Sequence, residues 1–282
     1  MVSGALKVRL AIPGLGSRRS VGANAVVTGA GSGIGRGFAC EIARRGGRVV
    51  CADIDDTGAK ETANLIGSQA LAWHCDVSDA EAVAEMADGA DDWFAGPTDL
   101  VVNNAGIGAG GTVIGDLLLD QWRRTIDVNL WGVIHGCHVF APRMRAAGRG
   151  GIINVGSAAG FAAAPRMAAY NVSKAAVLAL SETLAAELAG TGVAVTVLCP
   201  TFVKTNIVNP DLIDESAARL AMTAMKWTGV SPESVARAAL DGNDRGRLHV
   251  VPQFDAKVIW QTKRLVPATY TRALGVVERL AR

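Results

Sequence analysis

The chain lacks much of what several classes of protein require. It contains no uninterrupted apolar run of about 18 residues, so we expect no membrane-spanning helix. Its 5 cysteines are scattered without a Cys-x-x-Cys pair, which argues against a disulfide framework and favours a reducing, cytoplasmic compartment. The 4 histidines form no recognisable ligand set, so we expect no metal. A net charge of +2 with 50% hydrophobic residues excludes a mainly disordered chain.

The charges that are present are unevenly distributed. Residues 1–22 carry four basic side chains and no acid, residues 245–282 carry eight against two acids, and residues 23–244 are net acidic by eight charges. We therefore divide the chain into a basic N-terminal extension (1–22), a main domain (23–252) and a basic C-terminal extension (253–282). The acidic balance of the main domain gives no reason to expect nucleic-acid binding.

The C-terminal extension has apolar residues at helical spacing on either side of Pro267, among basic side chains: Val258, Ile259, Leu265, Tyr270, Leu274, Val277 and Leu280. This pattern predicts two basic amphipathic helices. Such helices can lie on an anionic membrane or pack against a second subunit. We favour the subunit contact, because the acidic main domain attracts a basic segment.

Short apolar, β-branched runs alternate with helical patterns throughout the main domain. The runs predicted as strands lie at 25–27, 49–52, 70–74, 100–102, 152–155, 193–198 and 248–251. Their alternation with helices predicts an α/β fold, with one doubly wound parallel sheet of about seven strands and helices on both faces. The runs are apolar throughout, as expected for strands buried on both sides. Ligands of such folds bind at the carboxyl ends of the strands.

The first predicted strand leads into a glycine-rich turn that opens a helix, formed by Thr28, Gly29, Ala30, Gly31, Ser32, Gly33, Ile34 and Gly35. Glycine lets a backbone approach a ligand, and the N-terminus of a helix attracts a pyrophosphate. Asp53 ends the second strand, where a carboxylate binds both adenosine ribose hydroxyls and repels a 2′-phosphate. An ordinary tight turn and a solvated acid are the alternatives. The combination favours NAD as the cofactor, with NADP less favoured.

Tyrosine is scarce, with 2 in the chain, and one of them is suited to proton transfer. Tyr170 and Lys174 are one helical turn apart, so the ammonium can lower the pKa of the phenol. A tyrosine tuned in this way exchanges protons with an alcohol or a carbonyl near neutral pH. Such a pair also occurs on ordinary helix faces. Ser157 ends the fifth strand, at the edge where α/β folds bind ligands.

Six motifs occur in an order and spacing that resemble the short-chain dehydrogenase/reductase family, in particular its simple NAD-dependent dehydrogenases. They are Thr28-Gly29-x-x-x-Gly33-x-Gly35, Asp76-Val77, Asn103-Asn104-Ala105-Gly106, Asn129, Ser157 and Tyr170-x-x-x-Lys174. The resemblance covers residues 23–252. It implies an oxidoreductase that forms a homodimer or homotetramer through helices near 116–146 and 167–190.

The resemblance also implies the roles of four catalytic residues. Tyr170 is expected to be the general acid and base. Lys174 is expected to lower the pKa of Tyr170 and to hold the nicotinamide ribose, and Ser157 to orient the substrate oxygen. Asn129 is expected to hold, through its backbone carbonyl, a water of the proton relay.

The cofactor contacts implied by the resemblance come from the ends of several strands. Asp76 is expected to bond the adenine amino group, with Val77 beside the ring. The adenosine side is expected to be lined by Asn103, Ala105 and Gly106, and the nicotinamide carboxamide to be held by Pro200, Val203 and Thr205. Thr201 departs from the family, which usually has glycine there, and a threonine restricts the backbone of this loop. The segment 201–228 is expected to cover an apolar substrate.

The expected function is an NAD(H)-dependent oxidoreductase that interconverts a secondary alcohol and a ketone on a largely apolar small molecule. A ketoacyl-thioester reductase of the same family is one alternative; such enzymes usually go with NADPH, against which Asp53 argues. A non-catalytic NAD-binding module is another, but such a module has no physical need of Ser157, Tyr170 and Lys174.

Overall fold

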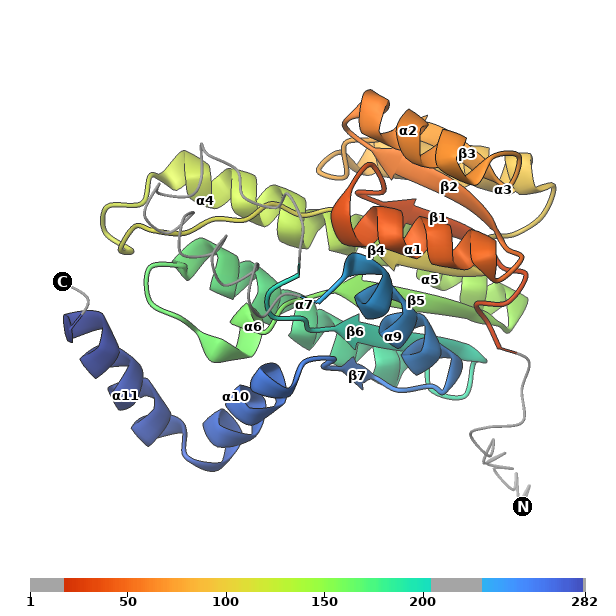
Figure 1. Ribbon diagram of the computed structural model, residues 1–282. Helices are drawn as coiled ribbons and strands as arrows, with labels where there is room; N and C mark the ends of the chain where they lie inside the picture. Colours follow the sequence, from red (N-terminus) through yellow and green to blue (C-terminus); the bar gives the residue numbers. More distant parts are fainter. Residues whose placement is uncertain (1–17, 204–229, 281–282) are drawn as a thin grey trace, which may run out of the picture.

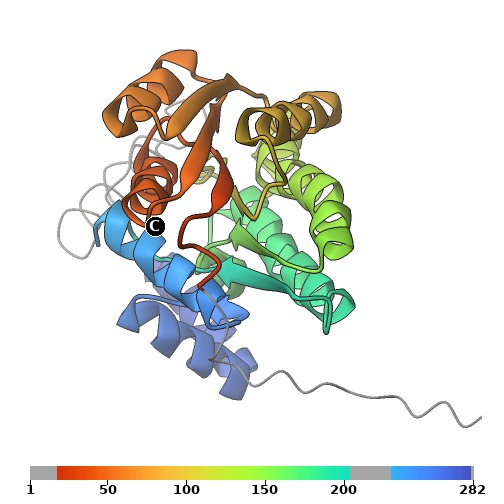
Figure 2. The same ribbon diagram turned by 90° about the vertical axis from the view of Figure 1, so that its right-hand side faces the viewer.

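The sequence folds around a seven-stranded sheet that carries helices on both faces (Figures 1 and 2). The computed structural model describes residues 18–203 and 230–280. The strands are all parallel, in the order β3-β2-β1-β4-β5-β6-β7. They are β1 (Asn24–Thr28), β2 (Arg48–Asp53), β3 (Ala70–His74), β4 (Leu100–Asn103), β5 (Gly150–Val155), β6 (Val193–Leu198) and β7 (His249–Val250). The predicted doubly wound α/β fold is thus confirmed, and each predicted strand is present.

The helices follow the strands in the order that the alternation predicts. They are α1 (Gly33–Arg44), α2 (Asp56–Ile66), α3 (Ala80–Phe94), α4 (Leu119–Ile126), the π-helical turn η1 (Asp127–Trp131), α5 (Gly132–Ala147), α6 (Ala159–Ala162), α7 (Ala168–Glu187), α9 (Pro232–Asp244), α10 (Phe254–Leu265) and α11 (Pro267–Leu280). Local caps explain several starts. Asp55 accepts a hydrogen bond from Thr57 N–H at the start of α2, and Ser231 caps α9 immediately before its proline.

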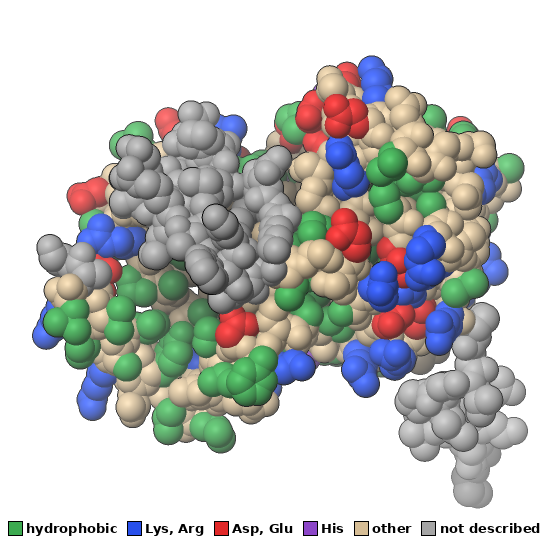
Figure 3. Space-filling model, in the orientation of Figure 1, with side chains coloured by type: hydrophobic (Ala, Val, Ile, Leu, Met, Phe, Trp, Pro, Cys, Tyr) green, Lys and Arg blue, Asp and Glu red, His purple; other side chains and the backbone are tan. Residues whose placement is uncertain are grey.

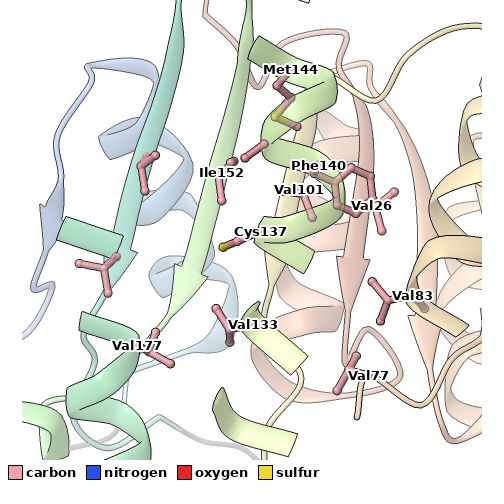
Figure 4. Packing of buried hydrophobic residues seen from close by; sticks show 14 of the residues in the cluster. Val26, Val77, Val83, Val101, Val133, Cys137, Phe140, Met144, Ile152 and Val177 are labelled. Carbon is pink, nitrogen blue, oxygen red and sulfur yellow. The ribbon is translucent and has the colours of Figure 1, made fainter. Parts of the chain in front are cut away.

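Two hydrophobic clusters cover the two faces of the sheet. Val26 of β1 belongs to the cluster formed with α3, α5 and α7, in which Figure 4 shows Phe140 and Val177 beside the strands. Its neighbours Ala25 and Val27 belong to the other cluster, formed with α1 and α9. Successive side chains of a strand point to opposite faces, so burial of both faces requires apolar residues at every position.

The strand order places a crevice at the carboxyl edge of the sheet. β1 lies between β2 and β4, so the chain winds in one direction from β1 to β3 and in the other from β4 to β7. The loops after β1 and β4 therefore diverge at this switch point, where doubly wound sheets bind their ligands. The glycine turn follows β1 and the Asn103–Gly106 motif follows β4, which brings two motifs far apart in sequence to one place.

The opposite end of the sheet is held by ion pairs around a buried carboxylate. Glu41 accepts hydrogen bonds from Arg44 at 2.7 Å and from Arg45 at 2.9 Å. These hydrogen bonds lower the pKa of Glu41 to about 2, and the bond from Arg44 has the largest effect. Arg45 also pairs with Asp241 of α9 at 2.9 Å. The network joins the end of α1 to the end of α9, well away from the crevice.

The C-terminal extension forms the two predicted helices, and α11 begins at Pro267. α10 packs Ile259 and Trp260 against the core, whereas α11 has no fully buried residue among those described. Both helices expose apolar side chains, namely Phe254, Val258, Leu265, Val276, Val277 and Leu280. Figure 3 shows hydrophobic side chains gathered over these helices, with Lys and Arg at their margin. In the described part of the chain, no helix combines the length and the apolar character needed to cross a membrane.

Candidate active site

The loop after β1 and the first turn of α1 form a tight cradle at the carboxyl edge of the sheet. Gly29 has a φ of +64°, and a Cβ on it would lie 2.8 Å from Ala105 Cα and 2.8 Å from Asn104 Nδ2. A Cβ on Gly35 would collide with the carbonyl oxygen of Gly29. Gly33 completes the turn with a φ of +52°. The cradle therefore accepts only glycine at Gly29 and Gly35, because backbone approaches backbone there.

The N-terminus of α1 opens into this cradle. Ser32 is the N-cap, and its side chain makes no capping hydrogen bond. The first turn of α1, which the structure describes in full, contains no acidic residue. Ile34 packs against the core behind the turn. The backbone N–H groups of this turn and the positive end of the helix dipole fit the pyrophosphate of a dinucleotide.

Two side chains tie the cradle to the loop after β4. Asn104 Nδ2 donates to the carbonyl oxygen of Thr28 at 2.8 Å. Thr28 Oγ1 in turn accepts from the N–H groups of Asn104 at 3.0 Å and Ala105 at 3.1 Å. Neither Thr28 nor Asn104 is among the expected cofactor contacts, although both belong to the motifs quoted above. Their hydrogen bonds fix the distance between the two loops that flank the crevice.

Asp53 lies beside the cradle at the end of β2, where a ribose partner is expected. Its Oδ2 accepts from Gly31 N–H at 2.7 Å. Arg36, the first basic residue after the glycine turn, pairs through Nη2 with Glu61 at 3.0 Å and donates through Nε to Thr62 at 2.9 Å. The cradle thus presents a carboxylate, and its neighbouring guanidinium is paired with an acid.

Two of the residues expected on the adenosine side, Asn103 and Val77, have buried side chains, and their expected cofactor contacts stay predictions. The side chain of Asn103 is buried and donates to Asn154 Oδ1 at 2.8 Å. It fits because Gly136 of α5 has no Cβ, which would collide with the Asn103 amide. Val77 is also buried and packs against Gly132. Strand periodicity does not predict the burial of these two side chains. Their burial depends on the space left by Gly132 and Gly136 of α5.

Asp76 and Ala105, in contrast, lie where loops leave the sheet. Asp76 Oδ1 accepts from Ser78 N–H at 2.9 Å and from Ser78 Oγ at 2.7 Å, which fixes the turn after β3. Ala105 belongs to the loop that Thr28 holds, and Gly106 follows it. Their expected contacts with the adenosine stay a prediction.

Asn129 is fully buried in the middle of η1 and clamps the loop after β4. Its Oδ1 accepts from Ile107 N–H at 2.8 Å, and its Nδ2 donates to the Ile107 carbonyl at 2.9 Å. Nδ2 also lies 3.3 Å from Ser173 Oγ of α7. The π-helical turn interrupts regular helix geometry at this residue, as such turns do at functional sites. The expected role of the Asn129 carbonyl in a proton relay stays a prediction.

Lys174 is buried next to the same loop. Its side chain is 3% exposed, and Nζ donates to the Val155 carbonyl at the end of β5 at 3.0 Å. A Cβ on Gly106 would lie 3.4 Å from Lys174 Nζ and 3.0 Å from Asn129 Oδ1. The glycine therefore leaves room for the lysine and the asparagine to meet in one place.

Tyr170 lies one turn before Lys174 on α7, as expected, and faces Ser157. Lys174 Nζ lies 5.8 Å from the centroid of the Tyr170 ring. Ser157 lies close enough to the Tyr170 side chain to lower the pKa of the phenol through side-chain hydrogen bonding. Ser157 Oγ also accepts from Ala159 N–H at 3.1 Å. The four expected catalytic residues thus come together from β5, α7 and η1.

Burial controls the protonation of this group. It raises the pKa of Tyr170 above the ordinary 10, and the hydrogen bond from Ser157 opposes the rise. It lowers the pKa of Lys174 from 10.5 to about 8. Loss of solvent disfavours the charged form of both groups. The expected lowering of the Tyr170 pKa by Lys174 stays a prediction.

The nicotinamide side is described in part. The Pro200 carbonyl accepts from Ala158 N–H at 2.9 Å, and Val203 is buried and forms a bridge with Val230. These contacts fix the start of the loop after β6. Thr205, and the apolar residues expected over the substrate between 204 and 229, lie outside the described residues.

Residues 23–216 match the family model described as short chain dehydrogenase. The chain belongs to the short-chain dehydrogenase/reductase family. Its 1-deoxy-11-beta-hydroxypentalenate dehydrogenase relative from Streptomyces exfoliatus is 35% identical over 254 residues, which cover 86% of this chain and 90% of the relative. The "Probable oxidoreductase EphD" of Mycobacterium tuberculosis is 46% identical over 186 residues, or 64% of this chain. That match spans 31%, about a third, of the length of the relative.

Solved structures of the family superpose well on the chain. A short chain dehydrogenase/reductase from Burkholderia phymatum in complex with NAD has a TM-score of 0.81 and 32% identity, with 87% of this chain and 94% of that chain covered. A 3-ketoacyl-(acyl-carrier-protein) reductase from Brucella melitensis complexed with NADH has a TM-score of 0.74 and 29% identity, with 82% and 98% covered. Both carry the short-chain dehydrogenase/reductase fold found here.

From the burial of Lys174 we predict how its replacement changes the free energy of unfolding. Because the folded pKa is about 8 and the ordinary value 10.5, the charged lysine costs up to about 3 kcal/mol at neutral pH. Lys174→Met removes this cost but also loses the hydrogen bond to Val155, which partly offsets the gain. We therefore expect the free energy of unfolding to rise by about 1–2 kcal/mol at pH 7. Urea denaturation at several pH values measures it.

The pH dependence is the control for this prediction. Between pH 8 and 10.5 the unfolded state binds more protons at this lysine than the folded state, so the unmodified protein gains stability with rising pH relative to the variant. The advantage of Lys174→Met should shrink across that range. A variant that is less stable at pH 7, with a constant difference up to pH 10, contradicts the assignment.

Proposed function

We propose that this short-chain dehydrogenase/reductase is an NAD(H)-dependent enzyme that interconverts a secondary alcohol and a ketone on a largely apolar small molecule. The observation that carries the proposal is the convergence on Tyr170, whose ring centroid lies 5.8 Å from the buried Lys174 ammonium and whose pKa Ser157 lowers through side-chain hydrogen bonding. A non-catalytic NAD-binding module has no use for a buried charge that destabilises its fold. The hydroxypentalenate dehydrogenase relative supports action on a CH–OH group by its name.

In this proposal Tyr170, Ser157 and Lys174 have different roles in one proton transfer. Bound NAD supplies hydride transfer to or from the substrate carbon. Tyr170, neutral at rest because its pKa is raised, gives its proton to the ketone oxygen in the reducing direction and takes it back in the oxidising one. Ser157 holds the same oxygen by a hydrogen bond. The Lys174 ammonium stabilises the phenolate that forms, in a site where low polarity strengthens the attraction.

A shallow depression lies between the loop after β4 and the start of α7. Its lining is mostly apolar, with Thr112 and Arg166 as its polar members, and includes Ala109, Gly110, Leu117, Met167 and Ala169. Nearby on the same loop, Ile114 and Leu118 are exposed. Apolar walls with few polar groups suit a hydrophobic substrate body, and a methionine adapts to its shape.

The ketoacyl-thioester reductase stays the alternative within the family. The argument that such reductases use NADPH does not exclude it, since the Brucella reductase was complexed with NADH. Activity with a panel of secondary alcohols, set against an acyl-thioester, separates the two proposals directly.

One prediction of the proposed function concerns catalysis. Tyr170→Phe should keep the affinity for NADH but lower kcat about 10²-fold or more, because the general acid and base is lost. In the unmodified protein, alcohol oxidation should speed up with rising pH and ketone reduction should slow down, because oxidation needs the phenolate. Steady-state kinetics of both directions and NADH fluorescence titration measure these effects. Full activity of Tyr170→Phe on a good substrate would sink the assignment.

A second prediction concerns cofactor choice. We propose NAD rather than NADP, because Asp53 lies beside the cradle and Arg36 is paired with Glu61. NADH should bind at least about tenfold tighter than NADPH, or about 1.4 kcal/mol. Asp53→Ala should narrow this ratio. Asp56→Asn, which removes an exposed acid three residues away, should leave the ratio unchanged; equal affinities for both cofactors in the unmodified protein contradict the proposal.

We also propose that the protein is a homodimer or homotetramer in which the exposed apolar face of α10 and α11 contacts a second subunit. Leu265 and Val277 are 77% and 61% exposed, so a charge there does not disturb the fold but opposes burial in an interface. Leu265→Glu combined with Val277→Glu should lower the mass in solution by light scattering. An unchanged mass, with loss of binding to anionic liposomes, favours membrane contact instead.

A further inference from the structure

The segment between Ser157 and Tyr170 carries backbone strain. It contains the single turn α6, followed by Ala163 with a φ of +52° and Arg166 with a φ of +60°. Left-handed backbone is unfavourable for residues with a Cβ, and such residues persist only where surrounding contacts fix them. Contacts from outside the segment 158–167 must therefore hold it.

α11 supplies two of these contacts. Tyr270 Oη donates to the Ala162 carbonyl at 3.0 Å, directly before the first strained residue. Glu278 forms two bonds to the guanidinium of Arg166, at 3.0 Å to Nε and 2.9 Å to Nη2. The donor Tyr270 and the acceptor Glu278 lie about two helical turns apart on one face of α11. They thus hold the segment at both strained positions.

α10 holds the neighbouring parts of the site. Trp260 stacks on Phe161 of α6, with ring centroids 5.9 Å apart and planes tilted by 24°. Asp255 accepts from Thr201 Oγ1 at 3.2 Å. Thr201 stands where the family usually has glycine, so its hydroxyl provides an anchor that glycine lacks. The helices of the C-terminal extension therefore contact both loops that flank Ser157.

Further hydrogen bonds join the segment to the loop after β4 and to α7. The Arg166 carbonyl accepts from Gly111 N–H at 2.7 Å, and the Ala164 carbonyl accepts from Asn171 Nδ2 at 2.7 Å. Asn171 follows Tyr170 on α7, and Arg166 and Met167 line the depression between the loop after β4 and α7. A shift of the segment therefore changes the wall of the depression and leaves the dinucleotide cradle untouched.

We propose that Tyr270 and Glu278 are positioning residues for substrate binding, and that α10 and α11 act as a brace that holds the segment 158–167 in its strained form. The inference rests on the proposed function, because it assigns substrate selectivity to contacts made outside the catalytic group. It gives the C-terminal extension a role on its inner face that is independent of any contact on its outer face.

The test uses Tyr270→Phe, Glu278→Gln and the double variant in the full chain. Arg272→Gln is the matched control, because it also removes one charge from α11 but lies on the exposed face. The double variant should raise KM for a secondary alcohol at least tenfold, with kcat lowered less than threefold. The ratio of kcat/KM between a bulky and a small substrate should fall at least fivefold. The NADH dissociation constant and the pH profile should not change.

Amide hydrogen exchange gives a readout besides activity. Exchange within 158–167 should speed up at least tenfold in the double variant, and exchange in the glycine turn and in α7 should match that of the unmodified protein. Unchanged exchange overturns the brace. Faster exchange without a change in KM or selectivity overturns the link to substrate binding. If the unmodified protein shows no alcohol or ketone activity, the proposed function fails, while hydrogen exchange still decides whether the brace exists.

Discussion

Parallel pairing of neighbouring strands is the constraint on which the site depends. Because β1, β4, β5 and β6 all run in one direction, their carboxyl ends meet at one edge, and residues more than a hundred positions apart converge there. The reversal of strand order between β1 and β4 then separates two loops and leaves room for a ligand. Thr28 and Asn104 hold those loops at a fixed distance through three hydrogen bonds of 2.8, 3.0 and 3.1 Å. The fold thus sets the geometry before any catalytic side chain is placed.

The catalytic group is costly to the fold and is maintained by its surroundings. Lys174 is a cation in an almost dry site, and its lowered pKa expresses the free energy of that burial. The hydrogen bond to the Val155 carbonyl of β5 partly compensates the cost of burying the Lys174 ammonium, and the absence of a side chain at Gly106 leaves space for the lysine. Tyr170 is shifted in the opposite direction by the same burial. Such paired shifts occur at sites built for proton transfer, where a charge forms during the reaction rather than before it.

The C-terminal extension belongs to this arrangement rather than to a separate unit. Its inner face contacts the strained residues between Ser157 and Tyr170, and its outer face leaves large apolar side chains in solvent. A helix pair that is amphipathic in this way can connect an active-site loop with a second surface. Substrate-facing loops in such folds vary widely, because the sheet and not the loops holds the cofactor.

The fold class, the strands, the glycine turn and the two C-terminal helices about Pro267 could be predicted from patterns in the sequence, and the four proposed catalytic residues from its resemblance to the family. The sequence does not reveal that the side chains of Asn103 and Val77 are buried, that burial raises the pKa of Tyr170, or that Tyr270 and Glu278 reach the segment before Tyr170. The physical reason is the same in each case. Burial, desolvation and contacts across more than a hundred residues depend on how elements pack, which local sequence patterns do not encode.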